Sequence, residues 1–173
     1  MDSARRHFLR GGFLTRQGRE GFECNTKARG PAPPWHVGSL RQEICTACEH
    51  PCVQACEMDI IRLHGSEHGL AGTPYLSFEQ GGCTFCQACL EACPMELEGL
   101  ADTQVRIGTA ALDVAACLAW SGVVCMSCRF SCTWRAITLD AHNRPSIDAE
   151  ICTGCGLCVG VCPKQAITVA IPR

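Results

Sequence analysis

The stretch Cys83-Thr-Phe-Cys86-Gln-Ala-Cys89-Leu-Glu-Ala-Cys93-Pro94 decides how the whole chain is organised. Its cysteines follow the spacing C-x2-C-x2-C-x3-C and end against a proline. The same pattern returns near the C-terminus, and two altered versions occur elsewhere. These further runs are Cys152, Cys155, Cys158 and Cys162 with Pro163, then Cys45, Cys48, Cys52 and Cys56, then Cys125, Cys128 and Cys132. The chain therefore contains an internal repeat with insertions.

The spacing is that of bacterial ferredoxin runs, in which three close thiolates ligate one 4Fe-4S cube and the fourth cysteine ligates a neighbouring cube. Disulfides are a poor alternative, because the chain has an odd count of 17 cysteines at tight spacings. Structural zinc usually closes with two separated C-x2-C pairs, which would leave a third close cysteine without a role. The pattern favours iron-sulfur clusters, and a structural zinc-binding adaptor is the weaker alternative.

Because the fourth cysteine of each run ligates the neighbouring cube, the runs predict which cysteines bind the same cluster. The first two runs predict one cluster on Cys45, Cys48, Cys52 and Cys93, and another on Cys83, Cys86, Cys89 and Cys56. In the third run Ala136 stands where a fourth cysteine is expected. We therefore predict a third cluster on Cys125, Cys128, Cys132 and Cys162, and a fourth on Cys152, Cys155, Cys158 and Cys117. Four 4Fe-4S clusters are favoured, although three also fit the sequence.

The predicted fold class is α+β, with tandem bacterial-ferredoxin-like (ββα-type) iron-sulfur modules after a flexible N-terminal tail. The predicted units are a basic Gly/Pro-containing tail (1–35), ferredoxin-type 4Fe-4S units at 36–66, 74–103 and 143–172, and an atypical unit at 104–142. Strands are expected within 58–63, over 75–78 and on both sides of the last run. Residues 110–120 suit a helix by composition, but short apolar runs are ambiguous.

One loop departs from the regular spacing. Glu49, His50 and Pro51 occupy the place of the usual two residues between Cys48 and Cys52, so a small bulge is expected there. Aromatic residues make up only 6% of the chain. The aliphatic core is thus too small for four separate units, and the clusters are expected to form part of it.

Other chemistry finds little support in the sequence. There is no nucleotide-binding glycine loop and no hydrolase-like Ser, His and acid arrangement, so no enzyme and no nucleic-acid partner are predicted. Cys24 has no C-x2-C neighbour and is expected to be a free thiol. The scattered histidines, expected at surface or packing positions, are His7, His36, His50, His64, His68 and His142.

Residues 1 to 30 carry seven basic and three acidic side chains. They include Arg5 and Arg6 in a pattern close to a twin-arginine export signal, but no apolar stretch follows it. The longest apolar runs also fall short of the roughly 18 residues of a membrane helix. We therefore expect a cytoplasmic protein without membrane insertion.

Taken together, the Arg5-Arg6 tail, Pro33-Pro34-Trp35, the four cysteine runs and Ala116-Cys117-Leu118-Ala119 resemble the NapF family. These are ferredoxin-type accessory proteins of the periplasmic nitrate reductase system. The resemblance implies binding to the precursor of the catalytic subunit, NapA, before its export, with a redox donor as a second partner. It also implies a role in maturation, by cluster assembly or electron delivery. The alternative is an electron carrier or an electron-transfer subunit of a larger oxidoreductase.

Overall fold

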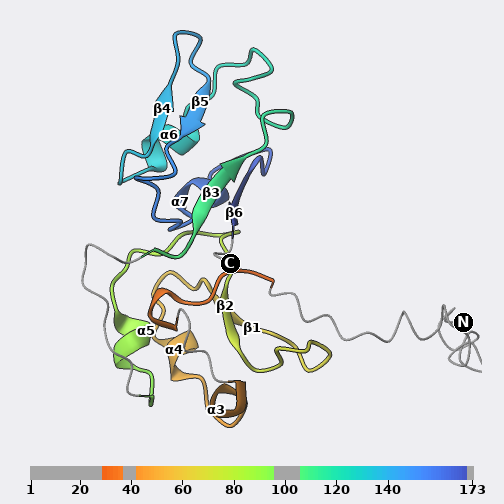
Figure 1. Cartoon of the computed structure of the whole chain (residues 1–173), viewed down its shortest axis with the longest axis vertical. Coiled ribbons are helices and arrows are strands. Elements are labelled where there is room, and N and C mark those ends of the chain that lie inside the picture. The colour runs from red at the N-terminus through yellow and green to blue at the C-terminus, as the bar shows by residue number, and fades with distance from the viewer. Residues whose placement is uncertain (1–28, 37–41, 96–105, 171–173) are drawn as a thin grey trace, which may run out of the picture.

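The computed structural model describes residues 29–36, 42–95 and 106–170, which form two lobes joined near the middle of the molecule (Figure 1). The first lobe holds η2 (Pro34–His36), α3 (Gln42–Thr46), α4 (Pro51–Gln54), β1 (Ile61–Leu63), β2 (Pro74–Leu76) and α5 (Ala88–Glu91). The second holds β3 (Thr109–Leu112), α6 (Ser127–Ser131), β4 (Ile137–Leu139), β5 (Pro145–Ile147), α7 (Leu157–Gly160) and β6 (Ile167–Ala170). No helix in these described ranges is long and apolar enough to cross a membrane.

All three sheets are antiparallel pairs of short strands. In the first lobe β1 pairs with β2, with Ile61 opposite Leu76. In the second lobe the outer strands β3 and β6 pair with each other, and the inner strands β4 and β5 form a hairpin. The expected strands around 58–63 and 75–78 are thus present in shortened form, and those flanking the last run are β5 and β6.

The suggested helix over 110–120 is wrong. Residues 109–112 form β3, in which Ala110 lies opposite Val169 of β6, and the following segment turns instead of coiling. Pairing with β6 satisfies the backbone polar groups of this stretch and buries Ala110. A partner strand more than fifty residues away therefore overrides the helical composition.

The same type of turn follows each of three cysteines in the repeat. The third residue after the cysteine has a positive φ and donates its backbone N–H to the cysteine carbonyl, and two buried residues follow. The three copies are Cys56 with Asp59, Ile60 and Ile61; Cys132 with Arg135, Ala136 and Ile137; and Cys162 with Gln165, Ala166 and Ile167. Ala136 is therefore equivalent to Ala166 in the core. It does not replace a fourth cysteine, because Cys132 itself occupies that position.

The lobes are joined through backbone groups packed at close range. Cys83 N–H donates to the Cys155 carbonyl at 2.7 Å, and Ile107 N–H donates to the Thr153 carbonyl at 2.9 Å. Gly156 has a φ of 80°, and a β-carbon there would collide with the ring of Phe78. One apolar cluster spans the joint and contains Ile60, Ile61, Leu76, Phe78 and Ile107, with Val159 and Val169 packed against it.

Gly82 offers a direct test of this joint. A β-carbon at Gly82 would overlap the backbone nitrogen of Leu157 and lie 2.7 Å from the Cys155 carbonyl oxygen. Since both neighbours are backbone atoms, we expect Gly82→Ala to lower the free energy of unfolding by about 1–3 kcal/mol. Gly81→Ala is the matched control, because its tightest contact would be with the flexible end of Met58 at 3.3 Å and its other neighbours lie at 3.9 Å. Equal midpoints for both variants in chemical denaturation would refute the tight joint.

Candidate metal centres

Four cavities are each lined by four cysteines and few polar groups. Cavity A is lined by Cys45, Cys48, Cys52 and Cys93; cavity B by Cys56, Cys83, Cys86 and Cys89; cavity C by Cys117, Cys125, Cys128 and Cys162; and cavity D by Cys132, Cys152, Cys155 and Cys158. The four cavities are similar in size. Four sites of similar size with the same donor set are suited to the same bound group.

Each cavity of the first lobe is lined by three cysteines of one run and one cysteine of the other run. Cys93 leaves its own run to line cavity A, and Cys56 leaves its run to line cavity B. These groupings are the same as those predicted from the crossing of the fourth cysteine. Helices α4 and α5 pack against each other and bring the two loops together.

In the second lobe, the predicted positions of Cys117 and Cys132 are wrong. Cys132 lines cavity D with the three close cysteines of the last run, and Cys117 lines cavity C with Cys125, Cys128 and Cys162. The physical reason is the turn after Cys132, which repeats the turn after Cys162 and directs both cysteines across to the neighbouring cavity.

The sequence contains two signals for this assignment. The gaps in Cys125-x2-Cys128-x3-Cys132 are those of the second to fourth cysteines of C-x2-C-x2-C-x3-C. Both Cys132 and Cys162 are followed, after three residues, by Ala-Ile. Aligning those dipeptides makes Cys132 the fourth cysteine of its run and leaves the first position open. Cys117, eight residues before Cys125, fills that open position in space.

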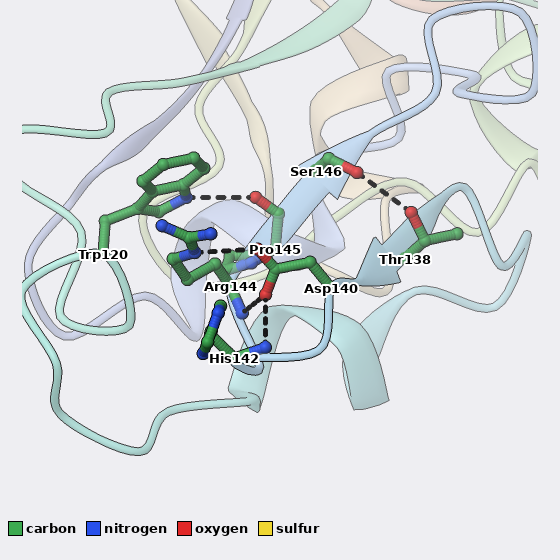
Figure 2. A network of polar contacts seen from close by, with 7 residues as sticks. All are labelled: Trp120, Thr138, Asp140, His142, Arg144, Pro145 and Ser146. Carbon is green, nitrogen blue, oxygen red and sulfur yellow. Dashed lines mark hydrogen bonds and ion pairs between the residues drawn. The ribbon is translucent and has the colours of Figure 1, made fainter.

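Trp120 stands three residues after Cys117 in the chain and is tethered to the β4–β5 hairpin (Figure 2). The indole Nε1–H of Trp120 donates to the Pro145 carbonyl at 3.2 Å, and the Arg144 guanidinium lies 4.7 Å from the centre of the Trp120 ring. Asp140 accepts from the Arg144 side chain at 2.7 Å and from its backbone N–H at 2.9 Å. This network holds the Trp120 turn against the hairpin and so fixes where Cys117 enters cavity C.

The extra residue between Cys48 and Cys52 is accommodated at His50. This residue has a φ of 56° and stands directly before α4, whose first residue is Pro51. Its ring Nε2 lies 2.8 Å from the Gly72 carbonyl oxygen, which gives the unusual turn a tertiary contact. The expected bulge is therefore present, and Cys48 and Cys52 still line the same cavity.

Each cavity receives a backbone N–H directed at one cysteine sulfur. The pairs are His50 to Cys48 at 3.3 Å in cavity A, Phe85 to Cys83 at 3.4 Å in cavity B, Ala166 to Cys162 at 3.3 Å in cavity C, and Ala110 to Cys152 at 3.4 Å in cavity D. Hydrogen bonds of this kind stabilise negative charge on sulfur and help to set the potential of an iron-sulfur cluster.

The electrostatics of the thiols require a positively charged group in the cavities. Burial, together with the neighbouring cysteines, raises the pKa of Cys52 and Cys83 to about 11 and that of Cys89 and Cys158 to about 12. Four such thiols do not ionise together near neutral pH unless metal ions compensate the charge. A single zinc ion needs all its ligands within about 2.3 Å, and no group of three or more His, Cys, Asp or Glu side chains among the described residues is arranged to hold one metal ion. The donor set and size thus fit a 4Fe-4S cube.

The other candidate residues have packing roles or lie outside the described ranges. His64 is buried, with Nδ1 3.0 Å from the Thr73 carbonyl oxygen and Nε2 accepting the backbone N–H of Arg29 at 3.2 Å. Burial lowers the pKa of His64, so this histidine packs as a neutral ring. Cys24 and the Arg5-Arg6 pair lie outside the described residues.

The tether of the Cys117 turn can be tested by changing Trp120. Trp120→Ala removes the indole hydrogen bond and the stacked Arg144, contacts that together contribute about 1–2 kcal/mol. We expect cavity C to bind iron less tightly, so that iron and acid-labile sulfide per chain decrease toward the values of Cys117→Ser. Trp120→Phe keeps a ring under Arg144 and should lose less. Full iron retention in Trp120→Ala under chelator challenge would show that the network does not position Cys117.

Comparison with known proteins agrees with the cysteine geometry. A 4Fe-4S dicluster domain model matches residues 44–97, and a 4Fe-4S binding domain model matches residues 145–168. These matches show a ferredoxin-type iron-sulfur protein built from a small mixture of helices and strands, and no enzymatic domain is among them.

Several relatives resemble the chain over most of its length. Ferredoxin-type protein NapF of Escherichia coli (strain K12) is 34% identical over 178 aligned residues, covering 97% of this chain and 94% of its own. Ferredoxin-type protein NapG of the same strain is 36% identical, covering 73% of this chain and 63% of its own. The methylamine utilization ferredoxin-type protein MauM of Methylorubrum extorquens is 32% identical, covering 87% of this chain and 77% of its own. Given this nearly full-length similarity, the chain belongs to the NapF family of ferredoxin-type proteins.

Proposed function

We propose that the protein carries four 4Fe-4S clusters, one in each of the cavities A to D, with the sixteen lining cysteines as ligands. The observation that carries the proposal is the division of these cysteines into four groups of four with no member shared or left over. The sequence units 36–66, 74–103, 104–142 and 143–172 then form two pairs of ferredoxin-like modules, and each pair exchanges two ligands.

The bound clusters would supply one-electron exchange at potentials that depend on hydrogen bonding, charge and burial. The polypeptide contributes the thiolates, the N–H groups directed at sulfur and the loops that keep water away. The polypeptide also determines which cavities lie next to each other. Exchange of cysteines makes A a neighbour of B and C a neighbour of D, and the hydrogen bond from Cys83 to Cys155 joins B to D. The row is therefore A, B, D, C, which differs from the order of the cysteine runs in the chain.

We infer from membership of the NapF family that the protein acts in the maturation of the periplasmic nitrate reductase. In this role it binds the precursor of the catalytic subunit, NapA, in the cytoplasm before export, and it assembles or reduces the precursor's own iron-sulfur cluster. The nearly full-length similarity to NapF supports the assignment. A row of clusters spanning two lobes also suits transfer of electrons between a redox donor at one end and the precursor at the other.

The number of clusters is tested by counting iron. Anaerobically purified protein is expected to contain about 16 iron ions per chain, because each 4Fe-4S cube holds four. Cys117→Ser should remove about a quarter of the iron and sulfide, since cavity C would lose one of its four thiols. Cys24→Ser is the matched control and should leave both counts unchanged. A wild-type count near 12 with no loss in Cys117→Ser would contradict the fourth cluster.

The maturation role is tested by binding. Immobilised protein is expected to retain purified NapA precursor that lacks its cofactors at least tenfold better than the finished enzyme, because a maturation factor must release its product. The comparison uses the cluster-loaded protein and is quantified by calorimetry. Equal or absent binding to both forms, together with rapid electron exchange with a redox donor, would favour the electron-carrier alternative.

A further inference from the structure

Thr153 is a buried polar residue whose hydroxyl has no protein partner. The residue is 9% exposed. Among the buried side-chain nitrogen and oxygen atoms of the described residues, the Oγ1 of Thr153 lacks a hydrogen-bond partner. Leaving a hydroxyl unsatisfied in the interior is energetically unfavourable. A buried polar atom of this kind calls for an explanation.

The hydroxyl is held at the wall of cavity D. Thr153 lines this cavity together with Cys152 and Cys155, the cysteines on either side of it in the chain. Its carbonyl accepts the Ile107 N–H at 2.9 Å, which anchors the backbone of the loop. Gly154 follows with a φ of 70°, packed so closely on Gly108 that a β-carbon would have no room. The loop thus has little freedom to turn the hydroxyl toward water.

A cysteine sulfur such as that of Cys155 can accept a hydrogen bond from a hydroxyl group. An O–H directed at sulfur stabilises negative charge there, as the Ala110 N–H does at Cys152 in the same cavity.

Equivalent threonines in the other runs do not share this environment. Thr46 and Thr84, like Thr153, directly follow the first cysteine of their runs. The Thr46 hydroxyl donates to the Gln42 carbonyl at 2.7 Å, within its own helix. Thr84 is exposed, so water can satisfy its hydroxyl. The repeated Cys-Thr sequence therefore places a hydroxyl without a partner only at cavity D among these three described threonines.

We propose that the Thr153 hydroxyl donates a hydrogen bond to a sulfur of the cluster in cavity D and raises the reduction potential of that cluster. The inference rests on the proposed four-cluster function. Three of the four cysteines of cavity D are buried. Burial disfavours the more negative reduced state, and a hydroxyl donor offsets this effect by stabilising the added charge. Thr153 is thus a positioning and tuning residue, and it is not a ligand.

The test compares Thr153→Val, Thr153→Ser and Thr84→Val. Each cluster-loaded protein is titrated with dithionite under redox mediators, and the reduced clusters are followed by electron paramagnetic resonance. Thr153→Val keeps the side-chain shape but removes the donor. One transition is expected to move to a more negative potential by about 59 mV, which corresponds to a tenfold smaller equilibrium constant for one-electron reduction. Thr153→Ser should restore the wild-type potential, and Thr84→Val should leave every transition in place.

Iron and sulfide counts separate the possible failures. An unshifted potential in Thr153→Val at full iron content would overturn the tuning role and leave the cluster assignment intact. Loss of iron in Thr153→Val would mean that Thr153 supports the loop structure, which also overturns it. If Cys158→Ser changed neither the iron content nor the spectrum, cavity D would hold no cluster and the proposed function itself would be wrong.

Discussion

Convergence of four thiols on each of four cavities is the constraint on which the rest of the structure depends. The helices that carry these cysteines are four or five residues long, too short to be stable alone in water. The strands are equally short, and the apolar clusters between them contain cysteines beside a few aliphatic residues. Clusters bound in the proposed way would supply part of the folding free energy, because metal binding compensates the charge of thiolates held close together.

The shortage of bulky side chains also determines how the two lobes are joined. Bulky residues are few, so the lobes approach through backbone atoms, with glycines at the points of closest contact. The hydrogen bond from Cys83 to Cys155 links a cavity B loop directly to a cavity D loop. As a result the loops that line cavities B and D meet at the joint.

Cavities C and D show how one repeated motif acquires different properties. In cavity C the first cysteine of the run is supplied from a distant turn, and the Trp120, Arg144 and Asp140 network compensates for the lost local connection. In cavity D both residues of the pair, Cys152 and Thr153, are buried, whereas in the second run Cys83 is half-buried and Thr84 is exposed. Neighbouring elements therefore adjust each site, although the cysteines themselves repeat.

The sequence by itself determined the class of protein, because C-x2-C-x2-C-x3-C-P specifies which thiols lie close together in a loop without reference to the rest of the chain. It also determined that Cys56 and Cys93 cross between the cavities of the first lobe. Only the tertiary structure decided the place of Cys117, because this cysteine stands eight residues before Cys125 and no spacing of the repeat assigns it to a cavity. The place of Cys132 was already indicated by the x3 gap before it and the Ala-Ile after it, and the turn at Arg135 and the buried Ala136 agree with that position. The strand at 109–112 and the burial of Thr153 were likewise beyond local reasoning. Both depend on contacts with residues far away in the chain, β6 in one case and Ile107 in the other.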